Sequence, residues 1–414
     1  MRRRVQRRGR QPRRAPGRRR RAAGEARPPG PRRARARRPH PRRPDRRRRR
    51  LDAGAALGRR GPIAAAARRR PRRPRRARDE TRALYAEARE LARDARAELA
   101  RVEAHVLARA RVVLTTCTGA DHPALADVAF DTVVLDEATQ SPDPLSLVAL
   151  ARAPRAVLAG DPRQLPPTVI DVDAARAGLG TTVFERLQDA GAAPAVMLIQ
   201  QHRMHADIMR FPSRSMYDGK LVAAPAVAAW TLADLDVAPD PLRPGALWLI
   251  DTAGTDWTEE RAISADDPGV VDPSTRNPGH AERVAAEVRR LLSRGVAPED
   301  VAVIAAYDAQ VRLLRERLAA ERAAGLEVGT VDGFQGREKE VIVVDLVRAN
   351  DRGEIGFLGD TRRMNVALTR ARRFLLVVGD SATLGNHAYY AAFLEAIDEL
   401  DAHGSAWSDD APPL

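Results

Sequence analysis

Short apolar runs without polar alternation constrain the fold of this chain more than any other feature. They lie at residues 112–116, 132–135, 156–159, 196–199, 301–305, 341–347 and 374–378. Runs of this length are typical of strands buried on both faces of a parallel sheet. The stretches between them predict covering helices, at about 281–293, 308–322, 362–372 and 386–401. We therefore expect an α/β fold of parallel sheets flanked by helices.

The charge of the chain is divided unevenly along its length. Residues 1–80 hold 35 arginines, no lysine and five acidic residues, a balance of +30, whereas the other 334 residues carry 36 basic and 50 acidic groups, a balance of −14. Residues 1–78 have too few large apolar side chains to offset the entropy of ordering a backbone, so we expect no fold there. Three interpretations stay open: a polycationic arm that neutralises phosphates, an inert tail, or out-of-frame translation of a GC-rich gene.

The part that follows the basic segment is long enough for two domains. About 330 residues exceed what one hydrophobic core usually holds. Apolar residues at steps of three or four predict an amphipathic helix from about 80 to 110. We predict a partial first domain at 79–190, a second domain at 191–402 and a C-terminal tail at 403–414. Residues 223–246 and 252–280 are rich in Pro, Ala, Asp and Gly and are predicted to be loops or insertions.

The composition argues against secretion and against a membrane span. One cysteine, Cys117, cannot form an intrachain disulfide. The chain has no run of 18 apolar residues, and its charged N-terminus lacks the apolar segment of a signal peptide. We therefore expect a cytoplasmic protein with no membrane partner.

Polar residues that directly follow the apolar runs are the first candidates for a site, because ligands lie beyond the carboxyl ends of parallel strands. Asp136 and Glu137 follow the run at 132–135 and have the form of a Walker B motif. A carboxylate there can hold Mg²⁺ through water, and the adjacent Glu can activate a water that attacks a γ-phosphate. The same pair can instead be the N-cap and first-turn acid of a helix.

A second candidate loop follows the run at 156–159. Gly160 and three prolines fix a rigid segment, GDPRQLPP, that can hold the Gln164 amide against a phosphate. A plain proline-rich turn is the alternative. Farther along, Arg370 is predicted to lie on the helix at 362–372, where a single arginine is usually solvated or packed along its stem.

Five segments together resemble the superfamily 1 helicases of the group that includes the nonsense-mediated decay RNA helicase. They are DEATQ at 136–140, GDPRQLPP at 160–167, QHRMHADIMRFPS at 201–213, TVDGFQGREKE at 330–340 and MNVALTRAR at 364–372. The resemblance covers roughly residues 80–402. It implies two RecA-like domains with ATP in the cleft between them, the second domain complete and the first one partial.

The resemblance also implies roles for individual residues. Asp136 would bind the nucleotide through Mg²⁺, Glu137 would activate water, and Gln164 would sense the γ-phosphate. Arg203 and Arg370 resemble arginine fingers, which stabilise the charge of a transferring phosphoryl group. The remaining positions are nucleotide contacts at Gly336 and Glu338, and nucleic-acid contacts at Thr115, Thr116 and Thr330.

The chain departs from the family pattern at the phosphate-binding loop, G-x-x-x-x-G-K-S/T, which its 414 residues do not contain. Its two lysines, Lys220 and Lys339, both lie in second-domain segments. His202 stands where the group more often has Tyr. We expect an ATP-dependent helicase or translocase acting on single-stranded or partly duplex nucleic acid, although this chain alone is expected not to turn over ATP.

The alternative is a non-enzymatic nucleic-acid-binding protein that uses the basic N-terminal arm. With 4% aromatic residues and an acidic core, we expect a grip on the nucleic-acid backbone more than on the bases. The residues alone do not distinguish DNA from RNA, and they define neither the direction of movement nor the oligomeric state.

Overall fold

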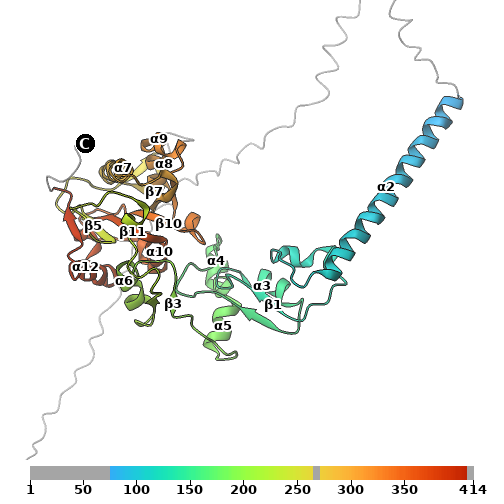
Figure 1. Ribbon diagram of the computed structural model, residues 1–414, viewed down its shortest axis with the longest axis horizontal. Helices are drawn as coiled ribbons and strands as arrows, with labels where there is room; N and C mark the ends of the chain where they lie inside the picture. Colours follow the sequence, from blue (N-terminus) through green and yellow to red (C-terminus); the bar gives the residue numbers. More distant parts are fainter. Residues whose placement is uncertain (1–74, 264–270, 408–414) are drawn as a thin grey trace, which may run out of the picture. The chain divides into compact units, whose positions relative to one another are not determined.

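The structure is a computed structural model that describes residues 75–263 and 271–407 (Figure 1). The chain divides into two compact units, residues 1–93 and 94–414. The prediction that residues 1–78 have no fold falls almost wholly outside the described residues. Within the described ranges, no helix combines the length and apolarity that spanning a bilayer requires.

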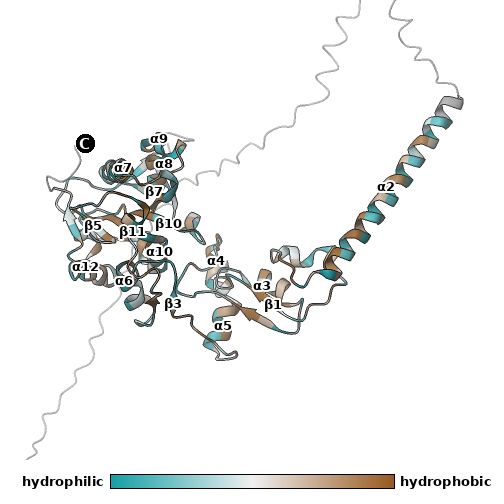
Figure 2. Ribbon diagram, in the orientation of Figure 1, coloured by the Kyte–Doolittle hydropathy of each residue, from teal (hydrophilic) through white to brown (hydrophobic). Residues whose placement is uncertain are grey.

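The predicted amphipathic helix is confirmed as α2, Arg75–Arg109. Hydrophilic and hydrophobic residues alternate along its ribbon (Figure 2). Its apolar side chains are exposed, including Leu84, Leu91, Leu99 and Val106. The helix therefore has the predicted periodicity, but its apolar stripe is not part of a core.

A six-stranded parallel sheet forms the centre of the region 191–402, which the sequence predicts to be the second domain. Its strand order is β12-β5-β11-β10-β8-β9. The bounds are β5 Leu247–Asp251, β8 Val301–Ala305, β9 Glu327–Thr330, β10 Lys339–Asp345, β11 Ala371–Gly379 and β12 His403–Ser405. The strands predicted at 301–305, 341–347 and 374–378 are confirmed as β8, β10 and β11. The prediction of a plain tail from residue 403 is wrong at β12, which pairs with β5.

Helices cover both faces of this sheet, as the unbroken apolar runs predict (Figure 1). Alternate residues of one strand enter opposite cores: Val303 packs on the side of α7 and α8, and Ile304 on the side of α6, α10 and α12. These helices are α6 Ala206–Met216, α7 Pro278–Ser293, α8 Asp308–Arg317, α10 Thr361–Leu368 and α12 Ala388–Asp398. Two shorter helices, α9 Ala319–Ala323 and α11 Ser381–Leu384, complete the layers.

Two predicted helices end differently from the prediction. The helix expected at 308–322 is divided into α8 and α9 at Leu318. The helix expected at 362–372 ends at Leu368, so the placement of Arg370 on a helix is wrong. The reason is that the chain joins the sheet at this point, where the Lys339 amide donates to the Arg370 carbonyl at 3.1 Å.

The predicted loop at 252–280 contains regular structure. It forms the antiparallel pair β6 Glu260–Ile263 and β7 Val271–Arg276, so the prediction of a loop is wrong there, whereas the alternative of an insertion stays a prediction. The segment at 223–246 is irregular apart from the end of β4, Val222–Ala223, and the 3-10 turn η5, Leu232–Leu235. β4 pairs with β3, Gln200–Gln201.

The region 79–190, predicted to be a partial first domain, has only a two-stranded parallel sheet among the described residues. β1 Val133–Leu135 pairs with β2 Ala156–Leu158, as predicted. The helical elements around it are η2 Thr118–Asp121, η3 Pro123–Leu125, α3 Asp143–Leu150, α4 Val172–Ala174, η4 Ala175–Leu179 and α5 Val183–Asp189.

The strands predicted at 112–116 and 196–199 are wrong. Leu114 is 92% exposed and Leu198 is 85% exposed, and neither run forms a ladder. An apolar run becomes a strand only when a neighbouring strand accepts its hydrogen bonds, and the β1–β2 sheet extends no further among the described residues. The same lack of neighbours leaves Val134 and Val157 exposed on the sheet.

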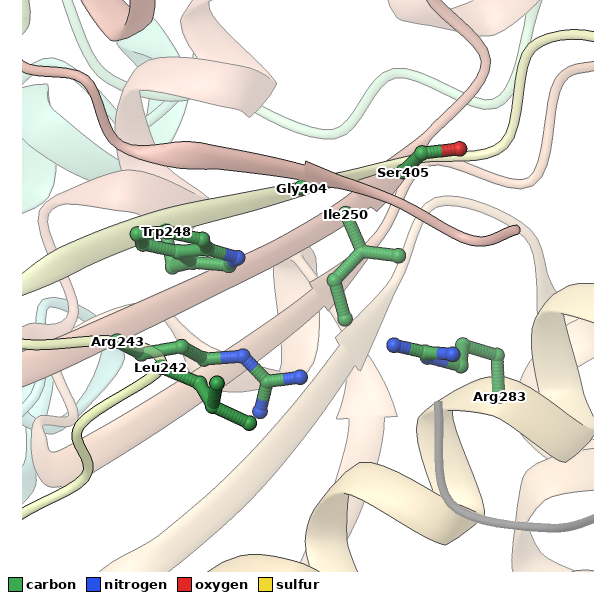
Figure 3. Close-up of a pocket in the computed structure, with 7 residues that line it drawn as sticks. All are labelled: Leu242, Arg243, Trp248, Ile250, Arg283, Gly404 and Ser405. Carbon is green, nitrogen blue, oxygen red and sulfur yellow. The ribbon is translucent and has the colours of Figure 1, made fainter. Parts of the chain in front are cut away.

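Two arginines share one buried carboxylate on the α7 face of the large sheet. Arg243 donates to Glu287 at 2.6 Å, and Arg283 lies 2.9 Å from the same carboxylate. The arginines approach one another beside a cavity that they line with Leu242, Trp248, Ile250, Gly404 and Ser405 (Figure 3). Burial lowers the pKa of Arg283, and Glu287 opposes that shift. Glu287 therefore compensates two buried cations.

Replacing Glu287 with Ala should destabilise the second domain by about 3–5 kcal/mol, because two buried guanidinium groups lose their counterion. Urea unfolding followed by tryptophan fluorescence, to which Trp248 beside this cavity contributes, measures the change. Glu282→Ala, on the same helix but in an exposed pair with Arg317, is the control and should cost under ~1 kcal/mol. Equal losses in both variants would contradict the prediction.

Candidate functional site

The carboxyl ends of β1 and β2 bring the two candidate loops of the first domain together. The strands pair in register, Leu135 opposite Leu158. Thr139 and Asp161 then exchange hydrogen bonds at 3.2 and 3.3 Å. Gly160 is needed at this crossing, because a Cβ there would lie 3.0 Å from the Thr139 backbone nitrogen. The segments 136–140 and 160–167 are therefore held edge to edge.

Asp136 and Glu137 are exposed at this edge. The Asp136 carboxylate accepts the Glu137 amide at 3.0 Å, and the Glu137 carboxylate accepts the Gln140 side-chain amide. Glu137 has a φ of 53°, in the left-handed region that non-glycine residues rarely adopt. A residue held there costs about 1–3 kcal/mol, and such strain is common at functional sites.

Gln164 is positioned by Asp161 within the rigid loop. Its side-chain amide donates to Asp161 at 2.9 Å, and its backbone amide donates to the Asp161 carbonyl at 3.0 Å. The neighbouring Leu165 is 2% exposed and belongs to the core of the second domain. The loop is therefore anchored at both ends, and the Gln164 carbonyl oxygen is left to accept from elsewhere.

That oxygen accepts a hydrogen bond from Arg370 of the second domain, at 3.3 Å. Arg370 is 2% exposed, and its guanidinium also donates to the Val366 carbonyl and the Thr369 hydroxyl. Burial, and then the nearby Arg203, lower the pKa of Arg370 to about 10, whereas Glu137 acts in the opposite direction. Arg370 thus stays a cation at neutral pH.

Strand register brings Glu338 beside Arg370. β10 and β11 pair with Lys339 opposite Ala371, and the two site residues directly precede these partners. Gly336, with a φ of 72°, turns the chain just before Glu338. All of these groups lie at the amino end of the large sheet.

Arg203 reaches the same place from the turn before α6. Its guanidinium forms an ion pair with Glu338 and donates to the Thr369 carbonyl at 3.1 Å. Its backbone amide donates to the side chain of Gln201 at 2.7 Å, and the amide of His205 donates to Arg372 at 2.9 Å. The start of α6 is therefore bonded to the start of β11. The structure thus brings together Gln164, Arg203, Glu338 and Arg370, with Glu137 near enough to influence the Arg370 charge.

The three threonines are placed separately. Thr330 ends β9 at the carboxyl edge of the large sheet. Thr115 and Thr116 lie in the irregular run before η2, not at the end of a strand as predicted. Thr116 accepts the Gly119 amide at 3.1 Å, so its hydroxyl caps a local turn.

Comparison with known proteins identifies the family. Two family models, each described as an AAA domain, match residues 18–172 and 179–382. DNA-binding protein SMUBP-2 of Rattus norvegicus is 43% identical over 304 residues, which is 72% of this chain and 30% of its own length.

Two further relatives are named as a DNA helicase and as a regulator of nonsense transcripts. DNA polymerase alpha-associated DNA helicase A of Schizosaccharomyces pombe is 38% identical, over 74% of this chain and 45% of its own length. Regulator of nonsense transcripts 1 of Caenorhabditis elegans is 36% identical, over 70% of this chain and 27% of its own length. The chain belongs to the superfamily 1 helicases. It spans between 27% and 45% of the length of these three relatives.

Tyr217 and Asn365 connect the helicase loop at 160–167 to the second domain, and the sequence reasoning missed both. Tyr217 donates to Asp161 at 2.7 Å. The Asn365 side-chain amide donates to the Tyr217 hydroxyl at 3.0 Å and to the Arg163 carbonyl at 2.9 Å. Burial and the Asp161 carboxylate raise the pKa of Tyr217, so its hydroxyl keeps its proton.

A sequence signal existed for one of these residues. Asn365 interrupts the apolar series of Met364, Val366 and Leu368 on α10, and it is fully buried. A polar side chain inside such a series needs a partner, which indicates a buried contact. Tyr217 has no comparable signal, because it follows the last residue of α6 in a polar stretch.

Tyr217→Phe should loosen the loop that holds Gln164, because Asp161 and Asn365 each lose a partly buried hydrogen-bond partner. A loss of about 1–3 kcal/mol is expected. Hydrogen exchange of the amides at 160–165, together with urea unfolding, measures it. Tyr85→Phe, which alters an exposed ring on α2, is the control. The prediction fails if exchange in the loop is the same in both variants.

Proposed function

We propose that this chain is part of an ATP-dependent helicase or translocase, acting on single-stranded or partly duplex DNA or RNA. The observation that carries the proposal is the contact between Arg370 and Gln164, which joins the two domains by charged and amide groups at one place. A nucleoside triphosphate has the charge to interact with such groups, and on binding it would separate the two side chains and take the place of their hydrogen bond. Family membership supports the same proposal, because relatives are named as helicases.

The proposed roles follow from charge. Phosphoryl transfer spreads negative charge over the γ-phosphate oxygens, and two guanidinium groups from the second domain can stabilise it. Arg370 and Arg203 are candidates for this role. Glu137, exposed opposite them, is the proposed base for the attacking water, and Gln164 is the proposed sensor of the phosphate.

The residues present fit Mg²⁺ delivered with ATP. Among the described residues, no group of three or more His, Cys, Asp or Glu side chains forms a metal cage. Mg²⁺ is usually held by one or two carboxylates together with substrate phosphates, and Asp136 offers one exposed carboxylate at this edge. The ion would neutralise phosphate charge there.

Movement along a strand would follow from the state of the cleft. ATP that contacts both domains favours a closed arrangement of the two. Loss of the γ-phosphate would break the contact between the nucleotide and Arg370 and allow the domains to separate. Gly336 and Glu338 would contact the nucleotide, and Thr115, Thr116 and Thr330 the nucleic acid. Localisation in the cytoplasm and these individual roles stay predictions.

We predict that this chain alone does not hydrolyse ATP, because no lysine-bearing loop holds the β- and γ-phosphates against the water at Glu137. Phosphate release in the presence of single-stranded nucleic acid should equal that of Glu137→Gln. Glu98→Gln, at an exposed position on α2, controls for the purification. Stimulated release that Glu137→Gln abolishes would contradict this prediction.

The second candidate function is nucleic-acid binding without catalysis, which the +30 balance of residues 1–80 favours. If the basic arm alone binds, removing residues 1–78 should abolish both the affinity and its steep dependence on salt. If ATP in the cleft controls binding, the affinity for nucleic acid of the chain without residues 1–78 should change when a non-hydrolysable ATP analogue is added. Arg370→Ala should remove that change. Affinity that ignores the analogue in every form of the chain would contradict the motor proposal.

A further inference from the structure

The carboxyl edge of the large sheet carries a second group of side chains, at the opposite end of the strands from Arg370. β8, β9 and β10 end here, at Ala305, Thr330 and Asp345. The segments that follow these strands meet around a small cavity. Its lining includes Ala306, Val331, Leu346, Phe357, Leu358 and Arg363.

Phe357 is the exposed member of this group. Its residue exposure is 48%, whereas Val331, Leu346 and Leu358 are buried. Gly356, with a φ of 52°, makes the turn that presents the ring, and a Cβ on it would collide with Arg348 at 2.0 Å. The Phe357 amide donates to the Tyr307 hydroxyl at 3.1 Å. The ring is thus held at the surface by fixed backbone geometry.

One face of the Phe357 ring is already covered by a cation. The Arg363 guanidinium carbon lies 3.9 Å from the ring centroid. Arg363 is itself fixed by Asp360 at 3.0 Å and lies 3.7 Å from Asp332. A stacked guanidinium and an aromatic ring form a flat, pre-organised surface that loses little entropy when a second flat group is added.

We propose that Phe357, backed by Arg363, is a stacking platform for one base of a single-stranded nucleic acid. The proposal rests on the proposed function, since it names a contact that the motor would make with its strand. The tilted ring of Tyr307 lies 6.1 Å from Phe357, centroid to centroid, and the other apolar neighbours are buried. A single exposed ring of this kind matches one planar base better than an apolar protein surface. Val331, which lines the same cavity, directly follows Thr330, the predicted backbone contact. Backbone and base would therefore be held side by side.

Two single-stranded oligonucleotides, matched in length and charge, test this proposal with the full-length chain. The affinity for a short oligothymidylate is compared, by fluorescence anisotropy at fixed salt, with that for an abasic strand of equal length and charge. The wild type should prefer the strand with bases. Phe357→Ala should weaken binding of that strand by about 5-fold to 150-fold and leave binding of the abasic strand unchanged, because stacking on an aromatic ring is worth about 1–3 kcal/mol per base.

Three variants make the result specific. Phe357→Trp should restore the preference, whereas Phe357→Leu, which keeps an apolar side chain without a π-face, should not. Trp407→Ala removes another exposed aromatic ring and should have no effect. An unchanged preference in Phe357→Ala or Phe357→Leu overturns the stacking platform while leaving the motor proposal intact. A wild type that binds neither strand overturns both.

Discussion

The pairing of β10 with β11 is the constraint on which the candidate site depends. The register that sets Lys339 opposite Ala371 also sets Glu338 beside Arg370, one residue before each strand begins. The strands are buried on both faces, so a shift by one residue would turn their apolar side chains into the wrong core. The register changes by one residue between Lys339, opposite Ala371, and Val341, opposite Phe374. The position of the charged pair therefore depends on this irregularity as well as on the packing of residues that have no chemical role. Arg203 then forms an ion pair with Glu338, whose position beside Arg370 is set by the two strands.

The two ends of the same sheet present different chemistry. The amino end gathers guanidinium groups and Glu338, with Arg370 buried, which suits a compact anion that arrives from the first domain. The carboxyl end presents Thr330 and the exposed Phe357, which suits an extended ligand that crosses the surface. Because the strands that join them are rigid, a change of position at one end is carried to the other as a movement of the whole domain. A rigid sheet is thus sufficient to couple the two proposed ligands.

The sequence predicts those parts of the fold that local pattern determines. β8, β10 and β11 were predictable because a run such as VAVIA has one way to bury every side chain, between two helical layers. The runs at 112–116 and 196–199 have similar composition but form no strand, because pairing depends on neighbours that composition does not reveal. The end of α10 before Arg370 was missed for a related reason: the following residues join a sheet, which helix periodicity does not register. Asp161, Tyr217 and Asn365 meet only through tertiary structure.

The groups proposed here for phosphoryl transfer are of the kind that act mainly in a transition state. Guanidinium groups placed against an exposed carboxylate stabilise charge that develops during phosphoryl transfer, and they contribute less to binding of the ground state. A glycine-rich loop with its lysine does the converse work of holding the β- and γ-phosphates. A chain with the first set and without the second should therefore retain the geometry of catalysis while binding ATP weakly. On this argument, the strained Glu137 is kept in place by the contact of its loop with GDPRQLPP, and its conformation does not require a bound nucleotide.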